Sequence, residues 1–170
     1  MGYDMAIAVI DAWSPNYNSR SGAAIDCIVI HDTESDTAAA ALSWFESPNS
    51  GVSAHYVIDR DGTVYRCVPD ELRAWHAGAS ELEGRTDVND FSLGIELVGF
   101  TTETFTDAQI DVLVELCVDL CLRYPAITVA RIVGHSDIAT PPGRKTDPGP
   151  HFPWDAVRAR IRIELDRRLA

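Results

Sequence analysis

The chain has 170 residues, of which 46% are hydrophobic and 24% are charged, which is typical of one globular domain with a sizeable core. Its formal net charge of −12 argues against a nucleic-acid-binding protein, because such proteins usually present a basic face to the phosphate backbone. The apolar runs are far shorter than the roughly 20 residues that span a bilayer, so we expect no membrane span. We interpret residues 1–170 as a single, monomeric domain.

The N-terminal segment, residues 1–10, carries one acidic residue, Asp4, and no basic residue. It lacks the charged start and apolar centre of a secretory signal, so we expect the chain as given to be cytoplasmic. A signal that had already been removed would leave no trace. The cysteines form no CxxC pair, and we interpret all four as buried thiols rather than as disulfides or metal ligands: Cys27, Cys67, Cys117 and Cys121.

The first half of the chain predicts a buried strand, a short helix and a β-hairpin. Residues 25–30, "IDCIVI", form a continuous apolar run that is typical of a buried strand, and the run ends at His31. A short helix is expected over residues 38–45. Two β-rich runs within residues 54–68 flank the dipeptide Asp61-Gly62, which is a strong hairpin signal.

The second half predicts two more strands and two longer helices. Residues 91–100 alternate in character, which predicts a strand that holds Glu96 on one face. A capping-box pattern opens a helix over residues 106–124. Residues 127–135 predict a strand that ends at His135, and a terminal helix begins near Pro153. This order of elements predicts an α/β fold with a mixed central sheet flanked by helices.

Two side-chain patterns complete the helix predictions. The acidic residues of the first long helix are interpreted as a solvated face: Asp111, Glu115 and Asp119. The terminal helix is expected to pack through an apolar stripe: Trp154, Val157, Ile161, Leu165 and Leu169.

Two of the predicted strands end at histidines, His31 and His135, and open α/β sheets place ligands beyond the carboxyl ends of their strands. A single histidine at a strand end is more often structural. Asp147, however, follows in the proline-rich stretch "GHSDIATPPGRKTDPGPHFPW", whose prolines restrict the backbone, and it could complete a set of two histidines and one aspartate. Three protein ligands plus water are the arrangement of a catalytic zinc site. The residue chemistry alone therefore suggests a metallohydrolase, without specifying its substrate.

Five segments in order carry a more specific resemblance: "IVIHDTES", "SAHYVIDRDGTVYRCV", "AWHAGAS", "NDFSLGIELVG" and the proline-rich stretch above. The chain resembles the zinc-dependent N-acetylmuramoyl-L-alanine amidases of the type 2 class from about Ile25 to Trp154. It is most similar to the branch that includes the anhydromuropeptide amidases of cell-wall recycling. Phage endolysins and peptidoglycan recognition proteins are more distant relatives of the same fold.

The resemblance implies one Zn²⁺ per chain, held by His31, His135 and Asp147, with Glu96 and Lys145 in catalysis. The family cleaves the amide between N-acetylmuramic acid, or its anhydro form, and L-alanine of the peptidoglycan stem peptide. In such chemistry Zn²⁺ polarises the carbonyl and lowers the pKa of bound water to about 7. The carboxylate would transfer the proton, and the lysine would stabilise the oxyanion.

One position departs from part of the family. Some phage amidases carry a catalytic tyrosine immediately before the histidine of the "HYVI" strand, where this chain has Ala54. Tyr56 lies two residues further on and does not match that motif. We therefore expect proton transfer to rest on Glu96.

Several other polar residues admit a binding role or a structural one. The resemblance places His76 at the substrate groove, where a substrate contact and simple packing are about equally expected. Arg85 and Arg144 could bind stem-peptide carboxylates through bidentate contacts, or could be solvated charges. We interpret His55 as a packed histidine and His151 as a surface residue. The tryptophans are assigned to the core or the groove wall: Trp44, Trp75 and Trp154.

Three functions remain open at this point. The complete ligand set together with Glu96 and Lys145 favours an active amidase over a non-catalytic peptidoglycan-binding module. A metallohydrolase that acts on another amide is the third alternative. The substrate could be intact peptidoglycan, as for an endolysin that acts after release, or soluble muropeptides in recycling. The acidic charge does not favour adhesion to an anionic wall, so we favour soluble muropeptides.

Overall fold

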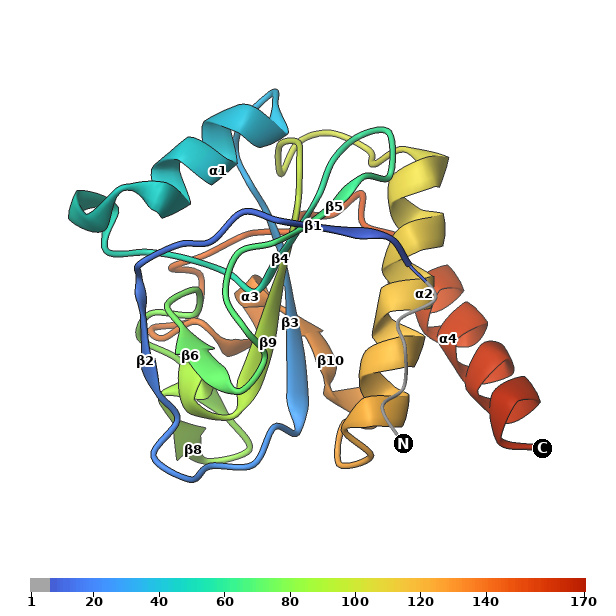
Figure 1. Cartoon of the computed structure of the whole chain (residues 1–170). Helices are drawn as coiled ribbons and strands as arrows, with labels where there is room; N and C mark the ends of the chain where they lie inside the picture. Colours follow the sequence, from blue (N-terminus) through green and yellow to red (C-terminus); the bar gives the residue numbers. More distant parts are fainter. Residues whose placement is uncertain (1–6) are drawn as a thin grey trace.

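A mixed six-stranded sheet forms the centre of the molecule, as the sequence predicted (Figure 1). The computed structural model describes residues 7–170, so the first six residues of the predicted domain and of its N-terminal segment lie outside the described residues. The strands, in their order across the sheet, are β1 (Val9–Asp11), β5 (Val64–Arg66), β4 (Tyr56–Ile58), β9 (Ser92–Leu97), β3 (Cys27–Asp32) and β10 (Ile132–Gly134). The last four run parallel to one another, whereas β5 is antiparallel to β4 and parallel to β1.

Helices cover both faces of this sheet. α2 (Asp107–Arg123) packs beside α4 (Trp154–Leu169) on one face, and α1 (Ala38–Glu46) lies on the other (Figure 1). The main apolar core lies between the sheet and the α2–α4 pair. A smaller cluster packs α1 against the opposite face through Phe45 and Val57.

The remaining elements are short. A four-residue helix, α3 (His135–Ile138), follows β10. Two small antiparallel sheets pair β2 (Tyr17–Ser19) with β6 (Leu72–Ala74) and β7 (Glu81–Leu82) with β8 (Arg85–Thr86). Single 3₁₀ turns lie at Pro48–Ser50, Val88–Asp90 and Val129–Arg131.

The predicted hairpin turn, the capping box and the buried free cysteines are confirmed. The hairpin predicted around Asp61-Gly62 is the β4–β5 pair, and Gly62 adopts a φ of +87°, a region that favours glycine. The capping box of α2 is present, because Thr106 Oγ1 accepts from the backbone N–H of Gln109 at 3.1 Å and the Gln109 side chain accepts from Thr106 N at 3.0 Å. All four cysteines are free and buried, as expected.

The predicted strand over residues 127–135 is wrong in its extent. Only Ile132–Gly134 forms a strand, because β10 is an edge strand that pairs with β3 over three residues. The preceding Val129–Arg131 turn is 3₁₀, and His135 begins α3 directly after the strand. Apolar residues with high β-propensity do not form a strand where no partner lies beside them.

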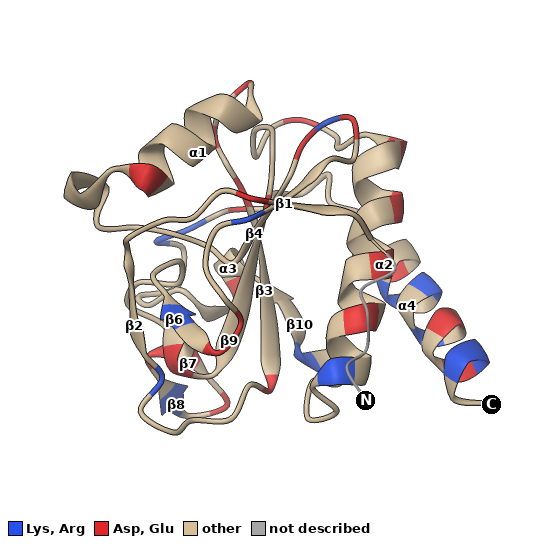
Figure 2. Cartoon of the chain, viewed as in Figure 1, with Lys and Arg blue, Asp and Glu red and all other residues tan. Residues whose placement is uncertain are grey.

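Two predictions about the helix surfaces also need correction. Leu169 is 72% exposed, because α4 packs against the core through earlier residues such as Val157 and Ile161. Asp119 is only 8% exposed and contacts Arg168 of α4 at 2.8 Å, so this part of the acidic face of α2 is not solvated. Figure 2 shows the acidic positions along α2 in red and the mixed acidic and basic positions of α4 beside them.

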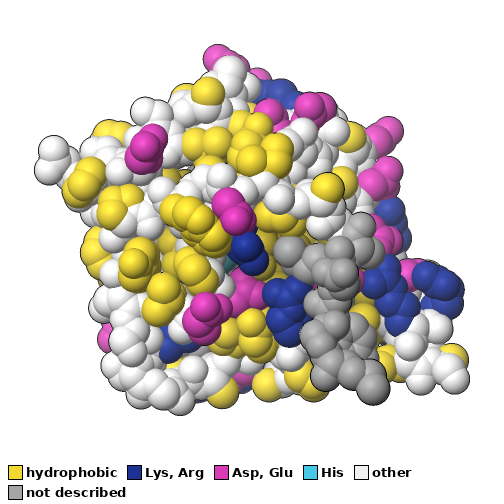
Figure 3. Space-filling view, viewed as in Figure 1, with side chains coloured by type: hydrophobic (Ala, Val, Ile, Leu, Met, Phe, Trp, Pro, Cys, Tyr) yellow, Lys and Arg dark blue, Asp and Glu magenta, His cyan; other side chains and the backbone are white. Residues whose placement is uncertain are grey.

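In the view of Figure 3, charged side chains gather over α2 and α4, whereas apolar side chains gather near α1. No helix within residues 7–170 combines the length and the apolar character needed to cross a membrane.

Candidate active site

Three neighbouring parallel strands place polar side chains together at their carboxyl ends. His31 in β3 pairs in register with Glu96 in β9, and β10 ends beside β3 immediately before His135. Alternate neighbours such as Ile30 and Ile95 point into the core beneath α2 and α4. Because successive side chains of a strand point to opposite faces, His31 and Glu96 point to the other face, as the alternation in the sequence predicted for Glu96.

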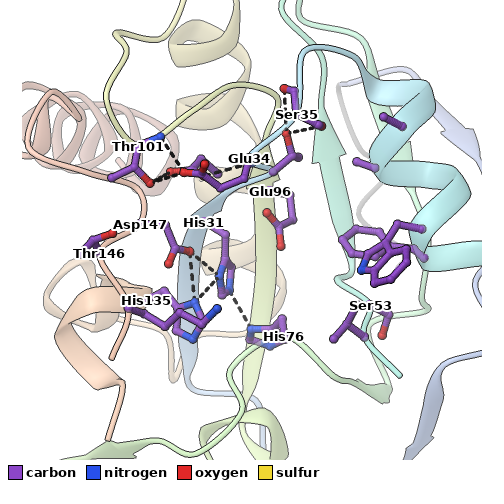
Figure 4. A pocket seen from close by; sticks show the side chains of 18 of the residues that line it. His31, Glu34, Ser35, Ser53, His76, Glu96, Thr101, His135, Thr146 and Asp147 are labelled. Atoms are coloured by element: carbon purple, nitrogen blue, oxygen red, sulfur yellow. Dashed lines mark hydrogen bonds and ion pairs between the residues drawn. The ribbon is translucent and has the colours of Figure 1, made fainter. Parts of the chain in front are cut away.

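Asp147 joins the two histidines from the proline-rich loop, and Figure 4 shows the three side chains converging. His31 Nδ1 lies 3.1 Å from His135 Nδ1, and Asp147 Oδ2 lies 3.0 and 3.1 Å from these two nitrogens. Two ligands of a tetrahedral Zn²⁺ are expected to lie about 3.3 Å apart, given bonds of about 2.0 Å. The donor set and its spacing therefore suit one metal ion.

The proton on His135 is fixed on the side away from this cluster. Its Nε2 lies 3.0 Å from the carbonyl oxygen of Ala77. A carbonyl oxygen only accepts hydrogen bonds, so Nε2 carries the proton of the neutral ring and Nδ1 keeps its lone pair. A lone pair aimed at the two other donor atoms is what a metal ligand requires.

The loop that carries Asp147 is held by its backbone and by a glycine. Ser136 N donates to the carbonyl oxygen of Asp147 at 3.0 Å, which ties the loop to α3. Gly149 adopts a φ of +87°, and a Cβ at this position would overlap the carbonyl oxygen of Thr101. Only glycine allows this close approach, which helps to set the position of Asp147 two residues earlier.

The pocket beside the cluster has a volume of about 840 Å³, and Glu96 and Lys145 both line it. Glu96 is 9% exposed, and its Oε2 has no hydrogen-bond partner among the described residues. Burial, followed by the negative charges of Asp147 and Asp32, raises the pKa of Glu96 well above its ordinary value. Lys145 opposes this shift, and it is the only lysine in the sequence. An unpartnered buried carboxyl group facing a pocket is typical of a functional site.

Sequence reasoning missed an acidic pair at the rim. Thr101 Oγ1 lies 2.7 Å from Asp32 Oδ2 and 2.6 Å from Glu34 Oε1, and all three residues line the pocket. Burial raises the pKa of Asp32 to about 7, so this pair carries less negative charge at neutral pH than two free carboxylates. The sequence signal was available, because Asp32 follows His31 directly and shares the strand end.

The three residues that were expected to contact substrate lie in different environments. His76 lines the pocket but is 8% exposed, and its Nδ1 lies 3.0 Å from Nε2 of His31. Arg144 also lines the pocket, yet its guanidinium donates to the carbonyl oxygens of Thr140, Ala77 and Ala79 at 2.8–3.1 Å. Its Nε and Nη2 atoms therefore hold two loops together, and a substrate contact through the rest of the guanidinium stays a prediction.

Arg85 is not brought to the site. It lies in β8, donates to Asp26 at 2.7 Å and stacks over the ring of Phe91 at 3.7 Å, and it is absent from the pocket lining. Its small hairpin carries the side chain away from the sheet edge where the strands end. The expectation that Arg85 contacts substrate is not supported.

The other histidines lie where the sequence suggested. His55 is fully buried, accepts from Gly94 N at 3.0 Å and has its other ring nitrogen 2.9 Å from the carbonyl oxygen of Leu72. His151 is exposed and is not part of the pocket lining. Tyr56 points into the core and donates to Asp70 at 2.6 Å, so it cannot serve the pocket.

The tryptophans divide between pocket and core. Trp44, which is 60% exposed, and the half-buried Trp75 line the pocket, whereas Trp154 packs on the main core.

The carboxyl ends of these parallel strands bring together two imidazole nitrogens, a carboxylate, a second buried carboxyl group and a lysine. This combination matches the class of metal-dependent hydrolases. Comparison with known proteins makes this more specific. The model of the N-acetylmuramoyl-L-alanine amidase family Amidase_2 matches residues 21–150, and the chain belongs to this family.

Individual relatives agree with the family. The chain is 48% identical over 124 residues to the 1,6-anhydro-N-acetylmuramyl-L-alanine amidase AmpD of Enterobacter cloacae, and the match covers 73% of this chain and 65% of that protein. It thus spans slightly less than two thirds of that relative. A crystal structure of a selenomethionine derivative of AmpD is 37% identical, with a TM-score of 0.82 over 94% of this chain and 99% of the other. AmpDh3 of Pseudomonas aeruginosa, in complex with anhydromuramic pentapeptide, is 32% identical, with a TM-score of 0.71 over 94% and 65%. These neighbours confirm the predicted fold.

Proposed function

We propose that this protein hydrolyses the amide between 1,6-anhydro-N-acetylmuramic acid and L-alanine of soluble muropeptides, as a zinc-dependent step in the recycling of peptidoglycan. The observation that carries the proposal is the set of three donor atoms 3.0–3.1 Å apart, from His31, His135 and Asp147, beside the buried Glu96. The relative AmpD is named for the anhydro substrate, and AmpDh3 holds an anhydromuramic pentapeptide. Both facts support the choice of substrate.

The proposed roles follow from position and charge. His31, His135 and Asp147 would hold Zn²⁺. The chemistry that Zn²⁺ supplies when bound is Lewis acidity, which polarises an amide carbonyl and makes water more acidic. Glu96 would take the proton from the attacking water and return it to the leaving amine of L-alanine.

Lys145 would stabilise the negative charge that develops on the amide oxygen. Its place two residues before Asp147 keeps the cation close to the metal-binding cluster, and its charge already acts on Glu96.

Two observations weigh against the alternatives. A non-catalytic module would need neither a metal-binding donor set nor an unpartnered buried carboxyl group beside it, and this chain has both. The net charge of −12 disfavours adhesion to an anionic wall, which supports soluble fragments over intact peptidoglycan as the substrate.

Zinc content and product identity test the proposal together. We expect about one Zn²⁺ per chain by elemental analysis, loss of activity on complete chelation and recovery on adding zinc. Mass spectrometry of a reaction with 1,6-anhydro-N-acetylmuramyl tetrapeptide should show the free sugar and a peptide that begins with L-alanine. A parallel reaction with intact sacculi should be much slower. Activity that survived complete zinc removal, or products cut within the peptide, would refute the proposal.

We expect Lys145→Met to lower kcat by about 10²- to 10³-fold, the usual effect of removing one oxyanion donor, with little change in zinc content. No other lysine in the chain could take its place. Lys145→Arg, which keeps the charge on a larger planar group, serves as the matched control and should retain more activity. An unchanged kcat in the methionine variant would exclude Lys145 from the reaction.

A further inference from the structure

We propose that His76 is a positioning residue for the metal centre: together with Ser92 it fixes the proton of His31 on Nε2, so that Nδ1 faces the metal as a lone pair. This inference rests on the zinc site of the proposed function. It gives His76 a role different from the substrate contact that the sequence suggested.

The assignment follows from a chain of hydrogen bonds that begins at a group able only to accept. The carbonyl oxygen of Val88 accepts from the Ser92 hydroxyl at 2.7 Å. Because that hydroxyl proton is used, Ser92 Oγ accepts from His76 Nε2 at 3.2 Å. His76 Nδ1 is then unprotonated, and it accepts from His31 Nε2 at 3.0 Å. The remaining nitrogen of His31, Nδ1, keeps its lone pair within the cluster (Figure 4).

Burial protects this chain from competing water. Ser92 is fully buried, and His31 and His76 are 2% and 8% exposed. The backbone beside His76 is also fixed, because Asn89 Oδ1 accepts from the N–H groups of His76 and Ala77 at 3.1 and 2.8 Å. The ring of His76 lies directly on β9 at Gly94, where a Cβ would come within 2.5 Å of it. The lack of a side chain at Gly94 therefore leaves space for this ring against the sheet, and a larger residue at position 94 would occupy that space.

Two adjacent residues, His76 and Ala77, accept the hydrogen bonds of both metal-facing histidines. His76 Nδ1 accepts from His31, and the carbonyl oxygen of the next residue, Ala77, accepts from His135 Nε2. Both imidazoles consequently present unprotonated Nδ1 atoms to Asp147, so three electron-pair donors converge with no proton between them. A cation is the natural complement of that arrangement. Outer-shell groups of this kind fix the tautomer and orientation of metal ligands.

Two variants separate an acceptor role from a packing role. His76→Asn places an amide oxygen near the position of Nδ1 but loses the ring, whereas His76→Phe keeps a ring of similar size but has no acceptor. Zinc affinity of the full chain is measured by competition with a chromogenic chelator. We expect His76→Phe to weaken zinc binding by about 10- to 100-fold, the usual effect of losing an outer-shell partner, and His76→Asn to retain most of the affinity.

A spectroscopic readout accompanies the affinity. In the zinc-loaded wild type, ¹⁵N NMR should show a slowly exchanging Nε2–H on His31, retained in His76→Asn and lost in His76→Phe. Wild-type zinc affinity in His76→Phe, or better zinc binding and NMR protection in His76→Phe than in His76→Asn, would overturn the inference. A wild type that binds no zinc would instead refute the proposed function.

Discussion

Replacing Asp147 by asparagine is expected to abolish stoichiometric zinc binding and activity, whereas replacing His151 by alanine should leave both nearly unchanged. The two residues lie four positions apart in the same proline-rich loop, and both side chains are of types that bind zinc. Asp147 Oδ2 lies 3.0 and 3.1 Å from the two histidine nitrogens, while His151 is exposed and outside the pocket lining. Position, rather than residue type, distinguishes them.

Asparagine keeps the shape of the side chain and one oxygen but removes the negative charge. That charge balances a dication, so the loss of zinc affinity should exceed the roughly 10- to 100-fold typical of outer-shell changes. Chelator competition and elemental analysis on folded protein measure it, with circular dichroism as the check on folding. If His151→Ala released zinc and Asp147→Asn kept it, the third ligand would be misassigned.

Strand signals in the sequence located the site well, because the chemistry lies at strand ends. The apolar run before His31 and the alternation around Glu96 each predicted a strand, and parallel pairing then brings both residues to one edge in register. His135 was placed correctly next to a strand end even though most of the predicted strand is absent. Three residues of pairing with β3 are enough to position it.

Loop packing was not predictable in the same way. Arg85 and Arg144 had the same two possible roles in the sequence. In the structure Arg85, in a remote hairpin, stacks on Phe91, whereas Arg144 donates hydrogen bonds to carbonyl oxygens at the pocket. The contact between His76 and His31 joins residues 45 positions apart, and its partner Ser92 lies in another strand. No local sequence pattern predicts such contacts, because they depend on how the loops pack against the folded sheet. The prediction that Asp119 lies on a solvated face of α2 failed for the same reason, since only the fold brings Arg168 of α4 next to it.

Glu96→Gln should separate metal binding from proton transfer. Glutamine keeps the shape of the side chain and a hydrogen-bonding oxygen but has no basic carboxylate, and Glu96 is not one of the three converging donors. Zinc content should therefore stay near one per chain. Because a positioned acid–base group contributes about 10²- to 10⁴-fold, kcat on an anhydromuropeptide should fall within that range.

The same substitution should change stability in a direction set by the pKa of Glu96. In the zinc-free protein, burial raises that pKa well above its ordinary value of 4.5, so the folded state holds a proton that the unfolded state releases. The contribution of Glu96 to the free energy of unfolding should then fall as the pH rises from about 4.5 towards the folded-state pKa, by about 1.4 kcal/mol for each pH unit in that window. Glutamine cannot ionise, so the variant should be more stable than wild type at pH 8, and the difference should shrink towards pH 4.5.

Measuring kcat and bound zinc on the zinc-loaded protein, and the thermal midpoint on the zinc-free protein, distinguishes this role from a structural one. A structural ion pair at Glu96 would make Glu96→Gln less stable with normal kcat per folded molecule, the opposite on both counts. Bound Zn²⁺ would itself lower the pKa of a nearby carboxyl group, which is how a buried residue could act as a base at neutral pH. A near-normal kcat at full zinc occupancy would remove Glu96 from the mechanism. Tyr56 could not replace it, because its hydroxyl is bonded to Asp70 within the core on the far side of the sheet.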